Sequence, residues 1–199
     1  PLRTSAVWGA FGEVTTIPHR YGSVRGPALR YDDSGLRYVW ADHASATVTV
    51  VRVDGQVSSA WQWRNAQDVT GHPVTLIEFS QPVTGDVEAE GIGKADATSG
   101  NQLTNPAAIV RDLMTTIAGR DAPNVAWVGY EAARLGIQCA GELAAAVSLQ
   151  SAIGALCGSI GALYSSRGRQ FARVYPGGRY EGGGADPADE SGPLVNVTL

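Results

Sequence analysis

Alternation of apolar and polar residues dominates the first half of the chain and predicts β structure. Residues 1–95 contain several runs with a period of two, most clearly from Thr47 to Val53, and this period is typical of a strand that buries one face. Asp54 and Gly55 follow at once, a pair that favours a type I′ turn and therefore a β-hairpin. The next apolar run predicts a further strand and contains Leu76, Ile77 and Phe79.

Spacings of three and four replace the alternation at residues 103–120, which predict one complete helix. Asn105 can cap its first turn, Pro106 suits the first helical position, and Gly119 can end the helix in a left-handed conformation. Apolar residues at helical spacing predict one buried face. They are Ile109, Val110, Leu113, Met114 and Ile117.

Further helices and a hairpin are expected downstream. One short helix is predicted within residues 125–136, and another over roughly 149–161 with Ser148 as its cap. Residues 163–175 predict a hairpin that turns at 167–168. We therefore expect an α+β protein: a β-rich N-terminal part with short strands and hairpins, then two or three helices packed on the sheet and a further β-hairpin.

These patterns divide the chain into three parts. Residues 1–95 form the β-rich part, residues 96–180 a part with helices and a hairpin, and residues 181–199 a flexible acidic arm rich in Gly and Pro. Apolar and polar residues alternate at the C-terminal end of the arm. This end segment either adds as a strand to a neighbouring subunit or is a frayed end. Its apolar positions are Val195, Val197 and Leu199.

Composition narrows the class of protein. The 199 residues are 44% hydrophobic and 17% charged, which indicates a folded chain with a substantial core. The net charge is -4 and no basic run occurs, so we expect no specific binding to nucleic acid. The N-terminus lacks the pattern of a secretory signal, and Pro1 fits a cytoplasmic product that has lost its initiator methionine.

One uncharged stretch, residues 143–164, has the length of a membrane span. Its larger apolar residues fall on a single stripe, which favours a helix packed on a sheet over one surrounded by lipid. The stripe contains Leu149, Ile153, Leu156 and Ile160. We therefore expect no membrane span.

Candidate chemistry is sparse. Asp42 and His43 are the one close pair of an acid and a histidine. We interpret them as an aspartate at the start of a strand next to a surface histidine, in preference to a catalytic dyad. Glu88 and Glu90 share one face of a strand, as in a solvated edge strand. The spacing of Cys139 and Cys157 is typical neither of a metal site nor of a disulfide framework. We therefore expect both cysteines to be buried free thiols. We expect no enzymatic activity, no cofactor and no metal.

A pair of tryptophans is more suggestive. Trp61 and Trp63 are two residues apart and therefore point to the same face of a strand. If exposed, they make a binding surface for a sugar or a protein; if buried, they belong to the core. Together with the terminal alternation they form the candidate interaction surface, which comprises Trp61, Trp63, Val195, Val197 and Leu199.

The order of segments from residue 40 to residue 176 resembles the hub domains of tail-tip and baseplate hub proteins of long-tailed bacteriophages and related gene transfer agents. In that family a capped helix of the "NPA" type follows a β domain, and a later helix of the pattern S-v-x-x-a-I-x-x-L leads into a hairpin. The corresponding segments here are Asn105–Met114, Ser148–Leu156 and Leu163–Val174. Hub proteins of this type are generally much longer than this chain.

The resemblance implies a structural role in the virion. The chain is then expected to assemble in the host cytoplasm into a ring with copies of itself and with other phage tail proteins, at the tail tip or baseplate. The alternative is a binding module that engages a carbohydrate or a host receptor through the aromatic face. A third hypothesis is a hydrolase with a site around Asp42 and His43.

Overall fold

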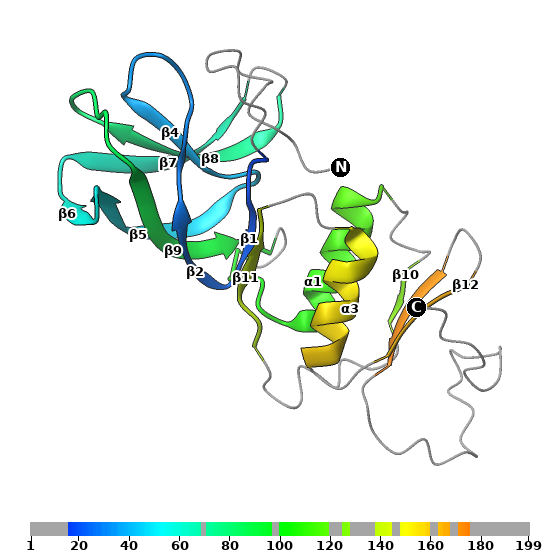
Figure 1. The fold of residues 1–199 in the computed structure, drawn as a ribbon. Coiled ribbons are helices and arrows are strands. Elements are labelled where there is room, and N and C mark those ends of the chain that lie inside the picture. The colour runs from blue at the N-terminus through cyan, green and yellow to red at the C-terminus, as the bar shows by residue number, and fades with distance from the viewer. Residues whose placement is uncertain are drawn as a thin grey trace. The chain divides into compact units, whose positions relative to one another are not determined.

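The structure, a computed structural model, describes residues 16–68, 71–96, 100–119, 125–127, 138–144, 148–159, 163–167 and 171–175. The chain divides into two compact units, which we describe separately (Figure 1). The β unit comprises residues 1–104 and 140–147, and the helical unit comprises residues 105–139 and 148–199. The expected division into residues 1–95, 96–180 and 181–199 stays a prediction, and residues 181–199 lie outside the described part.

The β unit is built from short strands, as the alternation predicts. Two four-stranded sheets have the orders β2-β9-β5-β6 and β3-β4-β8-β7, and β1 pairs with β11. All of these pairings are antiparallel. The strands are β1 (His19–Tyr21), β2 (Ser23–Pro27), β3 (Leu29–Arg30), β4 (Arg37–Ala41), β5 (Ser45–Val53), β6 (Gln56–Ser58), β7 (Trp61–Gln67), β8 (Pro73–Phe79), β9 (Val87–Lys94) and β11 (Gly141–Leu143).

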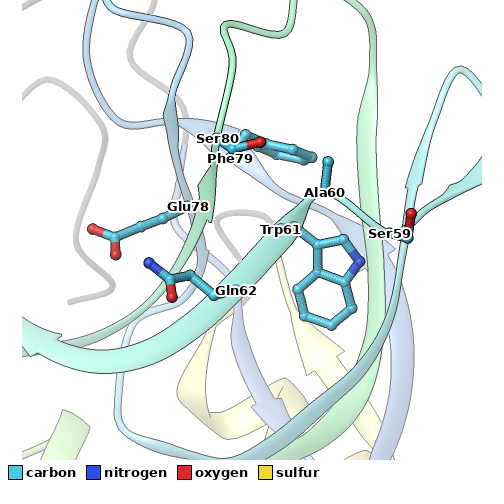
Figure 2. A pocket seen from close by; sticks show the side chains of 7 residues that line it. All are labelled: Ser59, Ala60, Trp61, Gln62, Glu78, Phe79 and Ser80. Carbon is cyan, nitrogen blue, oxygen red and sulfur yellow. The ribbon is translucent and has the colours of Figure 1, made fainter.

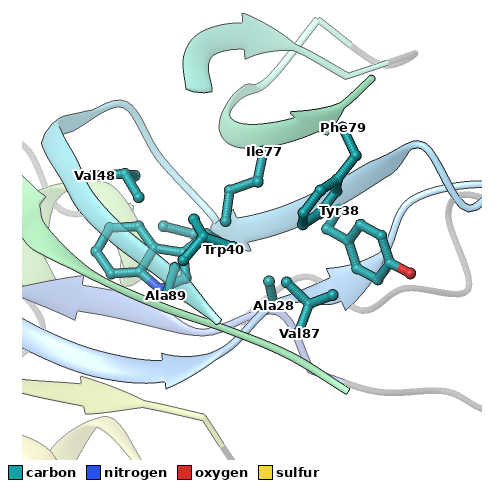
Figure 3. Packing of buried hydrophobic residues seen from close by; sticks show 10 residues of the cluster. Ala28, Tyr38, Trp40, Val48, Ile77, Phe79, Val87 and Ala89 are labelled. Carbon is teal, nitrogen blue, oxygen red and sulfur yellow. The ribbon is translucent and has the colours of Figure 1, made fainter. Parts of the chain in front are cut away.

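The main core lies between the two sheets (Figure 3). Trp40 and Ile77 from one sheet and Val51 from the other are completely buried. A second, smaller cluster covers the opposite face of β4 and β8 and includes Val39 and Leu76. Because β8 is buried on both faces, its apolar residues run consecutively instead of alternating. The main cluster contains Ala28, Tyr38, Trp40, Ala41, Val48, Val51, Ile77, Phe79, Val87 and Ala89.

The predicted turn between β5 and β6 is confirmed. Asp54 and Gly55 have φ angles of 50° and 79°, and a type I′ turn requires positive φ at both central residues. The carboxylate of Asp54 also accepts a hydrogen bond of 2.9 Å from the backbone N–H of Asp86. The turn is thereby fixed to the loop that precedes β9.

β9 is a central strand, which corrects the edge position expected from Glu88 and Glu90. It pairs with β2 on one side and with β5 on the other. The carboxylates lie on its outward-facing positions, while the positions between them are buried. Sequence alone does not separate the two cases, because a central strand with one solvated face shows the same alternation as an edge strand.

The helical unit begins with the predicted capped helix. Helix α1 (Pro106–Asp112) continues directly into the π-helix η2 (Leu113–Ile117). The side chain of Asn105 accepts a hydrogen bond of 3.3 Å from the N–H of Ala108, and Gly119 has the left-handed φ of 63°. Both end signals are confirmed. The residues of the predicted face that are buried are Ile109, Val110, Leu113 and Met114.

The prediction of a helix within residues 125–136 is wrong at its start. Val125–Trp127 forms strand β10, which pairs parallel with β13 (Phe171–Tyr175); residues 128–137 lie outside the described residues. Val and Trp favour strands, and pairing with β13 outweighs the weak helical periodicity. β13 also pairs antiparallel with β12 (Leu163–Arg167), the pairing expected for the predicted hairpin.

Helix α3 (Leu149–Ser159) is capped as predicted. The Ser148 hydroxyl accepts a hydrogen bond of 3.1 Å from the N–H of Ser151. The buried face contains Ile153 and Cys157, whereas Cys139 is only half-buried. Neither cysteine forms a disulfide. Taken together the chain is β-rich and broadly α+β, and no helix among the described residues is long and apolar enough to span a bilayer.

Candidate interaction surface

Two consecutive strands leave one side of the β unit open. Within the described part of the chain β6 pairs with β5 alone and β7 with β8 alone, so both are edge strands. Edge strands present backbone donors and acceptors that another chain can pair with. Val57 of β6 is 69% exposed. We call β6, β7 and the residues 59–60 that join them the open edge.

Trp61 and Trp63 lie on the inner face of β7. Both side chains are half-buried and pack against the main core cluster. The indole N–H of Trp61 donates a hydrogen bond of 2.8 Å to the carbonyl oxygen of Ser58. The tryptophans therefore form the rim of the core at the open edge, and only part of each ring faces solvent.

A pocket of about 360 Å³ lies where β7 begins and β8 ends. In Figure 2 Trp61 points to one side of the strand, while Gln62 and Glu78 point to the other. The pocket thus wraps around the start of β7, with an aromatic wall and a polar wall. It is lined by Ser59, Ala60, Trp61, Gln62, Glu78, Phe79 and Ser80.

The polar wall carries a paired charge. Arg64 donates two hydrogen bonds to the Glu78 carboxylate, from Nε at 3.1 Å and from Nη2 at 2.9 Å. The hydrogen bond from Arg64 lowers the pKa of Glu78, because it stabilises the ionised form. At neutral pH Glu78 is therefore a hydrogen-bond acceptor and an anion, without a proton to donate.

The outer face of the other sheet is electrostatically balanced. Nη2 of Arg25 lies 2.6 Å from Glu88, and Nη1 of Arg52 lies 2.5 Å from Glu90. The two arginines come from strands that flank β9, so cations and anions alternate across the sheet. Such a face has no concentrated positive charge to attract a phosphate backbone.

A buried arginine organises the opposite side of the β unit. The side chain of Arg20, on β1, is completely buried, and its Nε lies 2.9 Å from a carboxylate oxygen of Glu142 on β11. Nη1 donates to the carbonyl oxygen of Trp40 and Nη2 to that of Pro27, the latter at 2.8 Å. The guanidinium also lies 4.8 Å from the centre of the Trp40 ring. We call Arg20, Glu142 and these acceptors the Arg20 site.

Burial lowers the pKa of Arg20, while the charge and hydrogen bond of Glu142 act in the opposite direction. A buried charge is tolerated when its donors are all directed at acceptors. Here three nitrogens of the guanidinium have such partners. The site therefore joins strands β1, β4 and β11 and the end of β2.

His43 is buried, which corrects the surface position expected from the sequence. Its Nε2 accepts a hydrogen bond of 3.0 Å from the N–H of Arg20, and its Nδ1 donates to the carbonyl oxygen of Ala44 at 3.0 Å. One neutral tautomer satisfies both bonds. The nearby hydroxyl of Thr75 donates to the carbonyl of His43 at 2.7 Å and lies 2.8 Å from the hydroxyl of Ser45. This arrangement is that of a buried structural network.

The sequence patterns predict the surface with Trp61 and Trp63 but not the Arg20 site. The structure places Trp61 and Trp63 together at the open edge, while Val195, Val197 and Leu199 lie outside the described residues. Arg20 and Glu142 carry no signal in the sequence, because a single arginine and a single glutamate far apart in the chain form no pattern. No group of three metal-ligating side chains occurs among the residues that the structure describes.

Comparison with known proteins gives no relative. No family model, no curated protein and no solved structure matches the chain.

Proposed function

We propose that this protein is a structural, hub-like component of a bacteriophage tail tip or baseplate, and that it assembles into a ring through subunit–subunit packing. The observation that carries the proposal is the order of its elements. A β unit is followed by helix α1 with its Asn105 cap, then by helix α3 with its Ser148 cap, and then by the β12–β13 pairing. This is the order of the hub domains that the sequence resembles.

The surfaces of the β unit suit such a role. The open edge offers two unpaired strand edges and an exposed Val57, and strand edges associate through backbone hydrogen bonds. The balanced outer face pairs each glutamate of β9 with an arginine, which suits close approach of another protein surface. Ring assembly needs repeated contact between copies of this kind.

Immunogold electron microscopy tests the proposal. Antibodies raised against the purified chain are applied to tailed particles released by the bacterium that carries its gene, with antibody pre-absorbed on the chain as the control. We expect gold at the tail tip or baseplate, and peptides of the chain in the mass spectrum of purified particles. Particles that contain no such peptides would contradict the proposal.

The pocket at Trp61 favours a second candidate, a module that binds a carbohydrate or host receptor. Trp61 on one side of β7 and Gln62 and Glu78 on the other offer an aromatic and a polar surface, and binding of a glycan uses contacts of both kinds. Glycans that bind there are expected to shift the tryptophan fluorescence and to protect it from acrylamide. The shift should be lost in Trp61→Ala and kept in Val57→Ala, a matched change at an exposed position. Absence of any glycan-dependent shift would count against this function.

A further inference from the structure

Strand β1, which carries the buried Arg20, is held from two sides. On one side it pairs antiparallel with β11, and Arg20 lies opposite Glu142. On the other side, the carbonyl oxygen of Pro18, just before the strand, accepts a hydrogen bond of 3.0 Å from the backbone N–H of Asp42. Neither of the two hydrophobic clusters described above contains a residue of β1 or β11. Release of these two strands would therefore leave both clusters with all their members.

The acceptor for the backbone N–H of Arg20 is a side chain that can take up a proton. Nε2 of His43 accepts this hydrogen bond at 3.0 Å, and the imidazole is buried. Its Nδ1 carries the hydrogen that bonds to the carbonyl oxygen of Ala44. A proton on Nε2 would turn the acceptor into a donor that faces another donor, so the hydrogen bond to β1 would be lost. A backbone carbonyl in the same place would keep accepting at any pH in this range.

The surroundings of the imidazole already contain a positive charge. β1 supplies the guanidinium of Arg20, whose carboxylate partner is Glu142 of β11. The ring centre of His19, also on β1, lies 4.5 Å from that of His43, so a proton on either ring places a charge against the other. Asp42 precedes His43 in the chain and adds a half-buried carboxylate. The polar side chains from β5 and β8 in this network are uncharged, and they are Ser45 and Thr75.

We propose that His43 is an acid-sensitive switch: uptake of a proton at Nε2 releases β1 and β11, while the two four-stranded sheets stay folded. A histidine in an unfolded segment has an ordinary pKa of about 6.5. The released state takes up this proton, and the docked state, whose Nε2 is occupied as an acceptor, does not. Docking is therefore complete above about pH 6.5 and weakens below it, by up to about tenfold in the equilibrium constant per pH unit. The switch acts within one chain and does not depend on the proposed ring.

Hydrogen–deuterium exchange of the full chain between pH 7.5 and pH 5 tests the switch, with rates corrected for the pH dependence of exchange in unfolded peptides. Carboxylates stay largely ionised over this range. We expect residues 18–21 and 141–143 to lose protection below about pH 6.5, by up to about tenfold per pH unit, while residues 74–78 of β8 keep theirs. Unchanged protection of residues 18–21 down to pH 5 would overturn the switch. Simultaneous loss in β8 would overturn the local release.

Matched substitutions identify the histidine. His43→Gln places an amide oxygen near the position of Nε2 and cannot take up a proton, so protection of residues 18–21 should no longer depend on pH. His72→Gln, at an exposed histidine, should keep the wild-type dependence. A dependence that persists in His43→Gln would overturn the assignment to His43.

Nuclear magnetic resonance of the wild type gives a test that needs no variant. Long-range 1H–15N spectra report the proton on each ring nitrogen of His43 during the same titration. Proton uptake at Nε2 should have the same midpoint as the loss of protection at residues 18–21. A protonated His43 in a chain whose β1 remains protected would contradict the proposal.

Discussion

At the scale of single residues, Arg20 is the side chain whose charge depends most on its partners. It carries its charge in a completely buried position, and Glu142 neutralises it from a distant part of the chain. The contrast within the same unit is the pair Arg64 and Glu78, where the arginine is 54% exposed. The two pairs differ in the burial of the arginine, and loss of the carboxylate costs more where the remaining cation is buried, because solvent cannot replace its partner there.

We expect Glu142→Gln to lower the free energy of unfolding by about 3 kcal/mol, because it leaves a buried guanidinium without its counter-charge. Glu78→Gln, the matched change at the exposed pair, should cost less than about 1 kcal/mol. Urea denaturation of the two variants measures both. Equal losses of unfolding free energy in the two variants would show that the pair of Arg20 and Glu142 contributes no more to stability than the exposed pair.

The glycine at position 93 is required by a close approach of two backbones. A Cβ atom there would lie 2.3 Å from the carbonyl oxygen of Arg20, so Gly93→Ala should destabilise the protein by about 1–3 kcal/mol. At Gly154, inside α3, an added Cβ atom would have no other atom within 4 Å, and Gly154→Ala should stabilise by up to about 1 kcal/mol. The denaturation midpoints of the two variants should move in opposite directions.

The two thiols should differ in reactivity. Burial raises the pKa of Cys157 to about 11, so at pH 8 this thiol stays protonated and unreactive. Cys139 is half-buried and should react with Ellman's reagent in the folded protein, whereas Cys157 should react only on unfolding. Cys139→Ser provides the control, since it should remove the fast phase. A fast phase that persists in that variant would contradict the burial of Cys157.

At the scale of elements, the cross-strand pair between β7 and β8 predicts a pH dependence. The hydrogen bond from Arg64 lowers the pKa of Glu78 in the folded state, so its stabilisation is complete above the unfolded pKa and is lost as the pH falls through the folded pKa. The difference in unfolding free energy between the wild type and Glu78→Gln should therefore be largest at neutral pH and shrink on acidification. If the difference in unfolding free energy grew on acidification, the result would contradict the pairing of Arg64 with ionised Glu78.

Local signals in the sequence predict the elements that local forces decide. The turn at Asp54 and Gly55 and the caps Asn105 and Ser148 are fixed by side chains and backbone angles within a few residues. A short stretch of sequence is therefore enough to predict them. Strand periodicity places Trp61 and Trp63 on one face of β7 in the same way.

Features that depend on distant partners cannot be predicted from such stretches. Val125–Trp127 is a strand because β13 lies beside it, and β9 is central because β2 and β5 flank it. The pairing of Arg20 with Glu142 joins residues far apart in sequence. Pairing of this kind leaves no periodic trace in the sequence, because each partner satisfies a contact that only the fold creates.

At the scale of the whole molecule, the proposed association of copies rests on the surfaces of the β unit. The β unit has an open edge at β6 and β7 and a strand, β11, that arrives from a distant part of the sequence. The buried His43 has both ring nitrogens in hydrogen bonds.

Native mass spectrometry of the purified chain over a range of concentrations tests this role most directly. If copies pack into a ring, the spectrum should show one closed oligomer of fixed copy number that replaces the monomer as the concentration rises. A spectrum that shows only the monomer throughout, with intact folded charge states, would contradict the proposed ring.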